Sequence, residues 1–157
     1  EYKNFTGRND FTTLKVCRDS ENVYFYAETA QDITPSTDEN WMTLFIKTSD
    51  NKDSWYGYNY AVNLEKTHDN KAVLSENKGG WNWKNVCEVE MKVGANKMMI
   101  AVPRKALGLK EKLIDIQFKW ADNYQKNDKG EYDINTFYCH GDAAPYGRMN
   151  YVYSEVN

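Results

Sequence analysis

The residues best suited to acid–base or nucleophilic chemistry are few and scattered. The chain has two histidines, His68 and His140, and neither lies in a recognisable nucleophile signature. Four carboxylates gather in one stretch: Asp122, Asp128, Glu131 and Asp133. A glycosidase acid needs an apolar pocket that raises its pKa, whereas the neighbouring Asn127-Asp128-Lys129-Gly130 is polar. We therefore expect this chain, taken by itself, to have no enzymatic activity.

Hard oxygen ligands lie close together at residues 48–53, which read Thr-Ser-Asp-Asn-Lys-Asp. Calcium prefers such ligands, and its candidate ligands here are Asp50, Asn51 and Asp53. The spacing is not that of an EF-hand, and Lys52 lowers the local negative charge. A plain Asx turn is the alternative, so structural calcium and a metal-free turn both stay open.

The cysteines do not indicate a metal or redox site. Cys17, Cys87 and Cys139 are odd in number and widely spaced, which excludes a zinc knuckle and allows at most one disulfide. Whether any disulfide forms is left open, and alternation predicts that Cys87 is a buried free thiol.

Aromatic residues are the most informative part of the composition. They make up 15% of the chain, with 12 Tyr and 5 Trp, which is more ring surface than a polar domain needs for its core. Exposed flat rings suit the C–H faces of pyranoses, with polar neighbours to bind the hydroxyls. Charge is nearly balanced, with 20 Lys and Arg against 23 Asp and Glu. That balance gives no basic surface for nucleic acid.

The elements that must position these rings are strands, because period-2 alternation recurs along the chain. Nine strands are predicted: Thr13–Cys17, Val23–Thr29, Met42–Thr48, Tyr56–Asn63, Val86–Val93, Lys97–Val102, Leu113–Trp120, Ile134–Cys139 and Arg148–Tyr153. One short helical turn is predicted at Pro103–Leu107. The fold class is therefore all-β, a two-sheet antiparallel β-sandwich or jelly roll.

Three long polar loops are predicted between the strands, at Ala30–Asn40, Glu65–Lys84 and Ala121–Asp133. Residues 1–157 are the size of one domain. Because the chain begins at Glu1 and has no leader or apolar span, we expect a single domain excised from a larger protein.

Several ordered segments resemble the family 9 carbohydrate-binding modules and the wider group of DOMON-like β-sandwiches. The segments are ENVYFY at 21–26, WMTLFI at 41–46, the turn at 50–53 with Trp55-Tyr56-Gly57-Tyr58, Met98–Leu107, FKWADN at 118–123, Gly141-Asp142 and Gly147-Arg148. The resemblance implies a secreted or cell-surface protein, bacterial in origin, with a glycoside hydrolase or another carbohydrate-active enzyme covalently attached. It also implies calcium at Asp50, Asn51 and Asp53.

The resemblance further implies where a sugar is held. The family clamps a sugar end between two tryptophans, and Trp41 occupies the place of one of them. Tyr146 is the aromatic residue nearest the place of the second, and Asn123 matches an amide that bonds sugar hydroxyls.

The remaining aromatic residues are assigned to the core or to the surface from the residues beside them in the sequence. Trp120 continues an alternating strand, so it is expected in the core. Trp81 and Trp83 follow Gly79-Gly80 on a long loop and are expected on one side of it. Three tyrosines alternate on the face opposite Trp55 and form either a stacking platform or core: Tyr56, Tyr58 and Tyr60.

The sequence therefore predicts non-catalytic glycan or polysaccharide binding by a monomer without a membrane span. The expected stacking residues are Trp41, Trp81, Trp83 and Tyr146, and the expected hydrogen-bonding residues are Asn123, Gln125 and Arg148. Shallow sites of this kind have a Kd of about 10⁻³–10⁻⁵ M. Two alternatives stay open, a structural or docking module without sugar binding and a haem-binding redox domain with Met or His axial ligands. The sugar, its linkage, and binding at chain ends or within chains are also left open.

Overall fold

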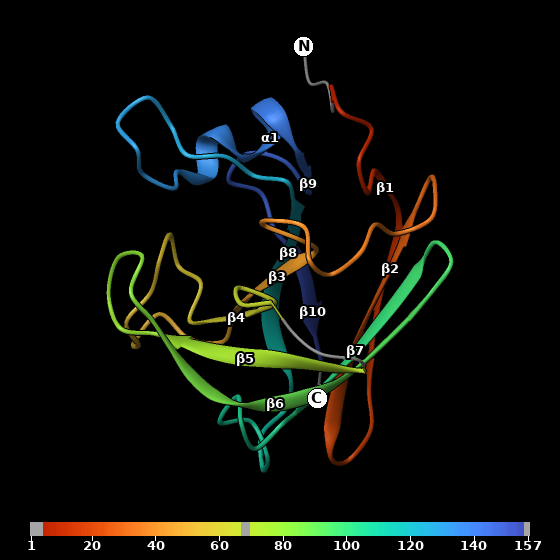
Figure 1. Ribbon diagram of the computed structural model, residues 1–157. Helices are drawn as coiled ribbons and strands as arrows, with labels where there is room; N and C mark the ends of the chain where they lie inside the picture. The colour runs from red at the N-terminus through yellow and green to blue at the C-terminus, as the bar shows by residue number, and fades with distance from the viewer. Residues whose placement is uncertain (1–4, 67–69, 156–157) are drawn as a thin grey trace.

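The computed structural model describes residues 5–66 and 70–155, and antiparallel strands dominate it (Figure 1). These residues form ten strands and two short helical segments. In chain order they are β1 (Phe11–Arg18), β2 (Asn22–Thr29), β3 (Thr43–Lys47), β4 (Tyr60–Val62), β5 (Lys71–Asn77), β6 (Trp83–Gly94), β7 (Lys97–Pro103), β8 (Asp115–Asp122), the 3₁₀ turn η1 (Ile134–Thr136), α1 (Phe137–His140), β9 (Asp142–Ala144) and β10 (Tyr151–Ser154). No helix among them is long and apolar enough to cross a membrane.

The strands are hydrogen-bonded along one path, β1-β2-β7-β6-β5-β4-β3-β8-β10, and β9 also pairs with β8. The sheet curls until it is nearly closed (Figure 1). Arg18 on β1 forms an ion pair with Glu155 just after β10, and the Phe11 amide donates to Asp142 Oδ2 at 2.7 Å. The prediction of an all-β fold is confirmed. The two-sheet division is not, because hydrogen bonds join the strands into one continuous sheet.

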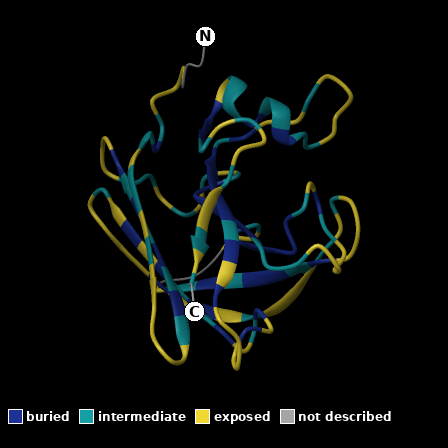
Figure 2. Ribbon diagram, turned by 180° about the vertical axis from the view of Figure 1, so that it is seen from behind, coloured by how far each residue is buried: buried dark blue, intermediate teal, exposed yellow. Residues whose placement is uncertain are grey.

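Strand alternation builds the main core on the inner face of this sheet (Figure 2). On β2 every second side chain, from Val23 to Thr29, is buried. Trp120 on β8 is fully buried in the same core, as its alternation with Ile116 and Phe118 predicts.

One predicted strand, Tyr56–Asn63, is broken by a turn. Tyr56 and Gly57 have φ angles of 51° and 94°, and Trp55 and Tyr58 pair across them with backbone bonds of 3.0 and 3.1 Å. Only Tyr60–Val62 remains as β4. The prediction that the three tyrosines share one face is therefore wrong. Tyr56 is exposed, whereas the core alternative is confirmed for Tyr58 and Tyr60, which are buried in two different clusters.

Other predicted segments also differ, and two of them differ in kind. The predicted loop Glu65–Lys84 contains β5 and the start of β6. The predicted strand Ile134–Cys139 is helical, because the Asp133 side chain caps η1 by accepting from the Asn135 amide at 2.9 Å. The turn after Pro103 is present as predicted, with Leu107 N bonded to Pro103 O at 3.4 Å.

Candidate functional site

A second group of packed rings covers the outer face of β3, β4 and β8. Phe45 on β3 lies at its centre, and six rings have centroids within 6.2 Å of the Phe45 ring: Trp55, Tyr58, Trp81, Trp83, Tyr124 and Phe137. Small residues on the neighbouring strands, Ala61 and Ala121, leave room for these rings. We call this group the aromatic cluster.

The exposed margin of the aromatic cluster opens into a pocket of about 480 Å³, which we call the aromatic pocket. Four rings line it: Trp55, Tyr56, Trp81 and Tyr132. The Trp81 centroid lies 4.5 Å from that of Trp55 and 4.3 Å from that of Tyr132. Two opposite charges, Lys126 and Glu131, and two glycines, Gly80 and Gly130, complete the lining. The pocket thus combines ring surface with hydrogen-bonding groups.

Trp81 is positioned by the turn between β5 and β6. The Asn77 side chain accepts from the Gly79 amide at 2.7 Å and donates to the Gly80 carbonyl at 2.8 Å. Both glycines have positive φ, 98° and 56°, which residues with a Cβ adopt at a cost. The Asn-x-Gly-Gly sequence therefore directs the indole towards the aromatic cluster.

Tyr132 is carried by a small hairpin at residues 126–132. Lys126 and Tyr132 form an antiparallel bridge, and Asn127 N donates to Glu131 O at 2.8 Å. The Asn127 side chain accepts from the amides of Lys129 and Glu131 at 2.9 and 3.0 Å. Lys126 Nζ lies 5.3 Å from the Tyr132 ring centroid, within cation–π range. This hairpin closes one side of the aromatic pocket.

Tyr56 connects the pocket to the start of η1. Its hydroxyl donates to Asp133 Oδ1 at 3.2 Å. Partial burial raises the pKa of Tyr56, and the nearby Asp133 carboxylate adds to that rise. The phenol is thus neutral and able to donate over the whole physiological pH range.

Trp41 is mostly buried, and it is one of the residues that line a depression next to the aromatic pocket. Its expected role in stacking on a sugar stays a prediction. Trp41 is 5% exposed, belongs to the main core, and donates from Nε1 to Thr34 O at 2.8 Å. The position of Trp41 just before a strand does not determine whether its side chain faces the core or the solvent. In this fold the side chain faces the core.

Trp81 and Trp83 lie together, as expected, with centroids 5.8 Å apart and planes 81° apart. Only Trp81 lines the aromatic pocket. Trp83 packs against Phe45. Its indole nitrogen is buried and has no hydrogen-bond partner among the described residues.

The other expected binding residues lie apart from the aromatic pocket. Tyr146 is 50% exposed and contacts Tyr138, with centroids 6.1 Å apart. Gln125 Nε2 donates to Asn123 Oδ1 at 3.1 Å, and these two residues line a neighbouring depression. Arg148 Nε donates to Asn135 Oδ1 at 3.0 Å. The structure therefore divides the seven expected residues among several places.

The turn at residues 48–53 is organised by a buried amide. Asn59 Oδ1 accepts from the amides of Thr48 and Ser49, and its Nδ2 donates to Asp53 O at 3.1 Å. Asp50 Oδ1 lies 2.5 Å from Lys47 Nζ. No group of three or more His, Cys, Asp or Glu in residues 5–66 and 70–155 is arranged to hold a metal. Calcium at Asp50, Asn51 and Asp53 stays a prediction.

The cysteines and His140 do not line the aromatic pocket. The three cysteines are free in the structure, and Cys87 is half-buried against the main core. His140 is exposed at the end of α1, and His68 lies outside the described residues. Axial ligation of a haem by Met or His stays untested.

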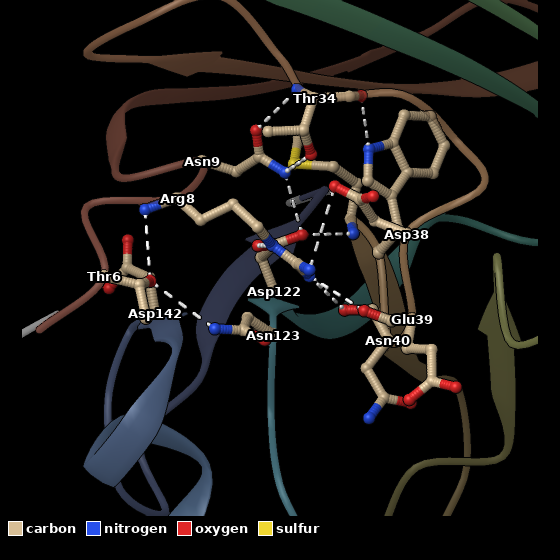
Figure 3. Close-up of polar contacts among 12 residues, drawn as sticks. Thr6, Arg8, Asn9, Thr34, Asp38, Glu39, Asn40, Asp122, Asn123 and Asp142 are labelled. Atoms are coloured by element: carbon tan, nitrogen blue, oxygen red, sulfur yellow. Dashed lines mark hydrogen bonds and ion pairs between the residues drawn. The ribbon is translucent and has the colours of Figure 1, made fainter.

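A buried polar network, not predicted from the sequence, joins the N-terminal segment to β8 and β9 (Figure 3). Asp122 is fully buried and accepts from Arg8 Nε, Asn9 Nδ2 and the Met42 amide at 2.7, 2.9 and 2.8 Å. Burial raises the pKa of Asp122, and the bonds from Arg8 and Asn9 oppose that rise. Asp122 is therefore held in a structural network, apart from the exposed Asp128.

Sequence reasoning missed four residues that line the aromatic pocket: Trp55, Lys126, Glu131 and Tyr132. It considered Tyr56 only as part of the tyrosine ladder that the turn breaks. The sequence Asn-Asp-Lys-Gly between Lys126 and Tyr132 is typical of a turn, and this hairpin could have been predicted from it. The chain matches no protein-family model, no curated protein and no solved structure, so its resemblance to family 9 carbohydrate-binding modules stays a prediction.

Proposed function

We propose that this chain binds glycans without catalysing a reaction, and that the aromatic pocket is the binding site. The observation that carries the proposal is the joint presence of Tyr56, Trp81 and Tyr132 with Lys126 and Glu131 around one opening. Rings stack on the C–H faces of a pyranose, and paired charges bond its hydroxyls.

The pocket is held in shape before any ligand arrives. Trp81 is fixed by the Asn77 side chain, and Tyr132 by the hairpin bonds of Asn127. Fixing the rings in advance reduces the entropy lost on binding. The pocket is open to solvent, so we expect a modest Kd of about 10⁻³–10⁻⁵ M.

The biological role that we propose is targeting. A non-catalytic module of this kind would keep a covalently attached carbohydrate-active enzyme close to its polysaccharide, outside the cell or at its surface. The family resemblance of residues 21–26, 41–46 and 118–123 supports this role. A docking module that binds no sugar remains the competing outcome of the test below.

The test is glycan-array binding followed by calorimetric titration of the strongest hit. Trp81→Ala and Tyr132→Ala should each weaken binding by about tenfold or more, because a stacked ring contributes about 1–3 kcal/mol. Tyr151→Ala is the matched control, since that ring is 42% exposed and lines none of the pockets described. Thermal melting of each variant separates lost contact from unfolding. A blank array with folded protein would overturn the proposal.

A further inference from the structure

Two further depressions each share a lining residue with the aromatic pocket. The first, which we call the acidic pocket, has a volume of about 260 Å³ and is lined by Asp38, Glu39, Asn40, Trp41, Asn63, Glu65 and Tyr132, among others. The second, which we call the amide pocket, has a volume of about 470 Å³ and is lined by Thr6, Asn123, Gln125, Lys126 and His140, among others.

The hairpin at residues 126–132 is the junction of all three depressions. Tyr132 lines both the aromatic and the acidic pocket, and Lys126 lines both the aromatic and the amide pocket. The two residues face each other as a backbone bridge. The Tyr132 ring contacts Trp81, and its hydroxyl donates to Asn40 Oδ1 at 3.3 Å. Polar pockets therefore flank a ring-lined centre.

We propose that the three pockets are consecutive subsites for one extended, neutral glycan, and that the site binds the interior of a chain and not only its end. This inference rests on the proposed function of the aromatic pocket. A ligand already immobilised at the centre gains contacts on both sides without a second loss of translational freedom. Affinity should therefore increase with chain length.

The acidic pocket restricts the chemistry of the chain. Asn63 is 5% exposed, and its Oδ1 has no hydrogen-bond partner among the described residues. Asp38, Glu39 and Glu65 add three carboxylates, against Lys66 in the lining and Arg8, which forms an ion pair with Asp38 at 3.9 Å. Acceptors in excess favour hydroxyl donors, and the negative charge repels carboxylated sugars. We therefore expect uronic acid chains to bind more weakly than neutral chains.

The experiment compares β-1,4-linked hexasaccharides with their disaccharides by calorimetry. The neutral probes are cellohexaose, xylohexaose and mannohexaose with cellobiose, xylobiose and mannobiose, and hexamannuronate, β-1,4-linked like mannohexaose, is the acidic probe. For at least one neutral series, the hexasaccharide should bind about tenfold more tightly than the disaccharide and more tightly than hexamannuronate.

Variants at the acidic and amide pockets then test whether these two pockets account for the higher affinity of the hexasaccharide. Glu39→Ala combined with Gln125→Ala should reduce the hexasaccharide-to-disaccharide ratio of affinities to about threefold or less. The matched control combines Glu111→Ala with Gln31→Ala, both exposed and outside the three pockets. Thermal melting confirms that each protein is folded.

Three results would overturn the inference. They are equal affinity for hexasaccharide and disaccharide, a length gain that the double variant retains, and binding of none of the neutral hexasaccharides. In each case the proposed function survives if the glycan array still shows binding that Trp81→Ala removes. A blank array overturns both.

Discussion

Arg8 Nε donates to Oδ2 of the fully buried Asp122 at 2.7 Å, so a residue close to the start of the chain pairs with a carboxylate on β8 (Figure 3). The guanidinium also donates from Nη2 to Glu39 O at 2.8 Å. This pairing fixes the N-terminal segment beside the loop that carries the acidic pocket. It links the stability of the fold to the shape of the proposed site.

Arg8→Ala should lower the free energy of unfolding by about 3 kcal/mol at pH 7, because it leaves a buried carboxylate without its cation. Urea denaturation measures this loss. Arg148→Ala is the control, and this exposed arginine should change stability by less than about 0.5 kcal/mol.

The loss from Arg8→Ala should depend on pH in a known direction. Burial already raises the pKa of Asp122, and removing the opposing cation raises it further. Below that raised pKa, Asp122 is protonated and neutral in the folded protein, so burying it without the Arg8 cation no longer costs as much free energy. The deficit should therefore shrink as pH falls towards the ordinary Asp pKa. A deficit that is constant between pH 7 and pH 4 would contradict this account.

Trp41→Ala should behave as a core substitution. The ring is 5% exposed in the main core, so truncation opens a cavity and should cost about 3–5 kcal/mol of folding free energy. Chemical denaturation measures the loss, with the half-exposed Tyr146→Ala as the mild counterpart. A Trp41→Ala protein as stable as the wild type would contradict the placement of this ring in the main core.

Most of the sheet could be predicted from the sequence, because burial on one face leaves a period-2 pattern. β2 and β7 follow their predicted segments within one residue at each end. The pattern fails where one local conformation overrides it. Tyr56 at a φ of 51° turns the chain, which alternation cannot reveal, since a non-glycine residue adopts this conformation rarely.

The candidate site could be predicted only in part, because many of its contacts join residues that are far apart in the sequence. Trp81 was expected in the site because it follows Gly79-Gly80 in a stretch predicted to be a long loop, where the structure has a turn between β5 and β6. Its contact with Tyr132, and the pairing of Arg8 with Asp122, join segments far apart in the chain. Such contacts depend on the order of strands in the sheet. Neither composition nor spacing contains that order.

Gly141→Ala should destabilise the protein by about 3 kcal/mol or more, through crowding of the backbone. A Cβ on Gly141 would lie 2.0 Å from Asp122 O and 2.7 Å from Asn123 C, so β8 and the start of β9 must separate. Gly94→Ala is the matched control. A Cβ there meets no atom within 4 Å, and the change should stay within about 0.5 kcal/mol. Equal melting temperatures for the two variants would contradict the crowding.

Lys119 offers a test of charge burial on the outer face of β8. Its side chain is fully buried, and its ammonium donates to the backbone oxygen of Pro145. No ion pair joins it to a carboxylate in the part of the chain that the structure describes. Desolvation lowers the pKa of Lys119 to about 8 from 10.5. Keeping the group charged below pH 8 therefore costs folding free energy.

Lys119→Met removes that charge and keeps a side chain of similar length. The variant should be more stable than the wild type by about 2 kcal/mol at pH 7. This figure is the free energy gained by no longer burying the charge, minus the free energy lost with the hydrogen bond to Pro145. Because the folded pKa is lowered, unfolded Lys119 binds more protons than folded Lys119 between about pH 8 and 10.5. Wild-type stability then rises with pH relative to the variant, and the variant's advantage should disappear over that range.

Urea denaturation at pH 7, 8.5 and 10 measures the difference, with the exposed Lys97→Met as a control that should show none. A variant less stable than the wild type at pH 7, by an amount that does not change with pH, would show that burial of the Lys119 charge costs nothing.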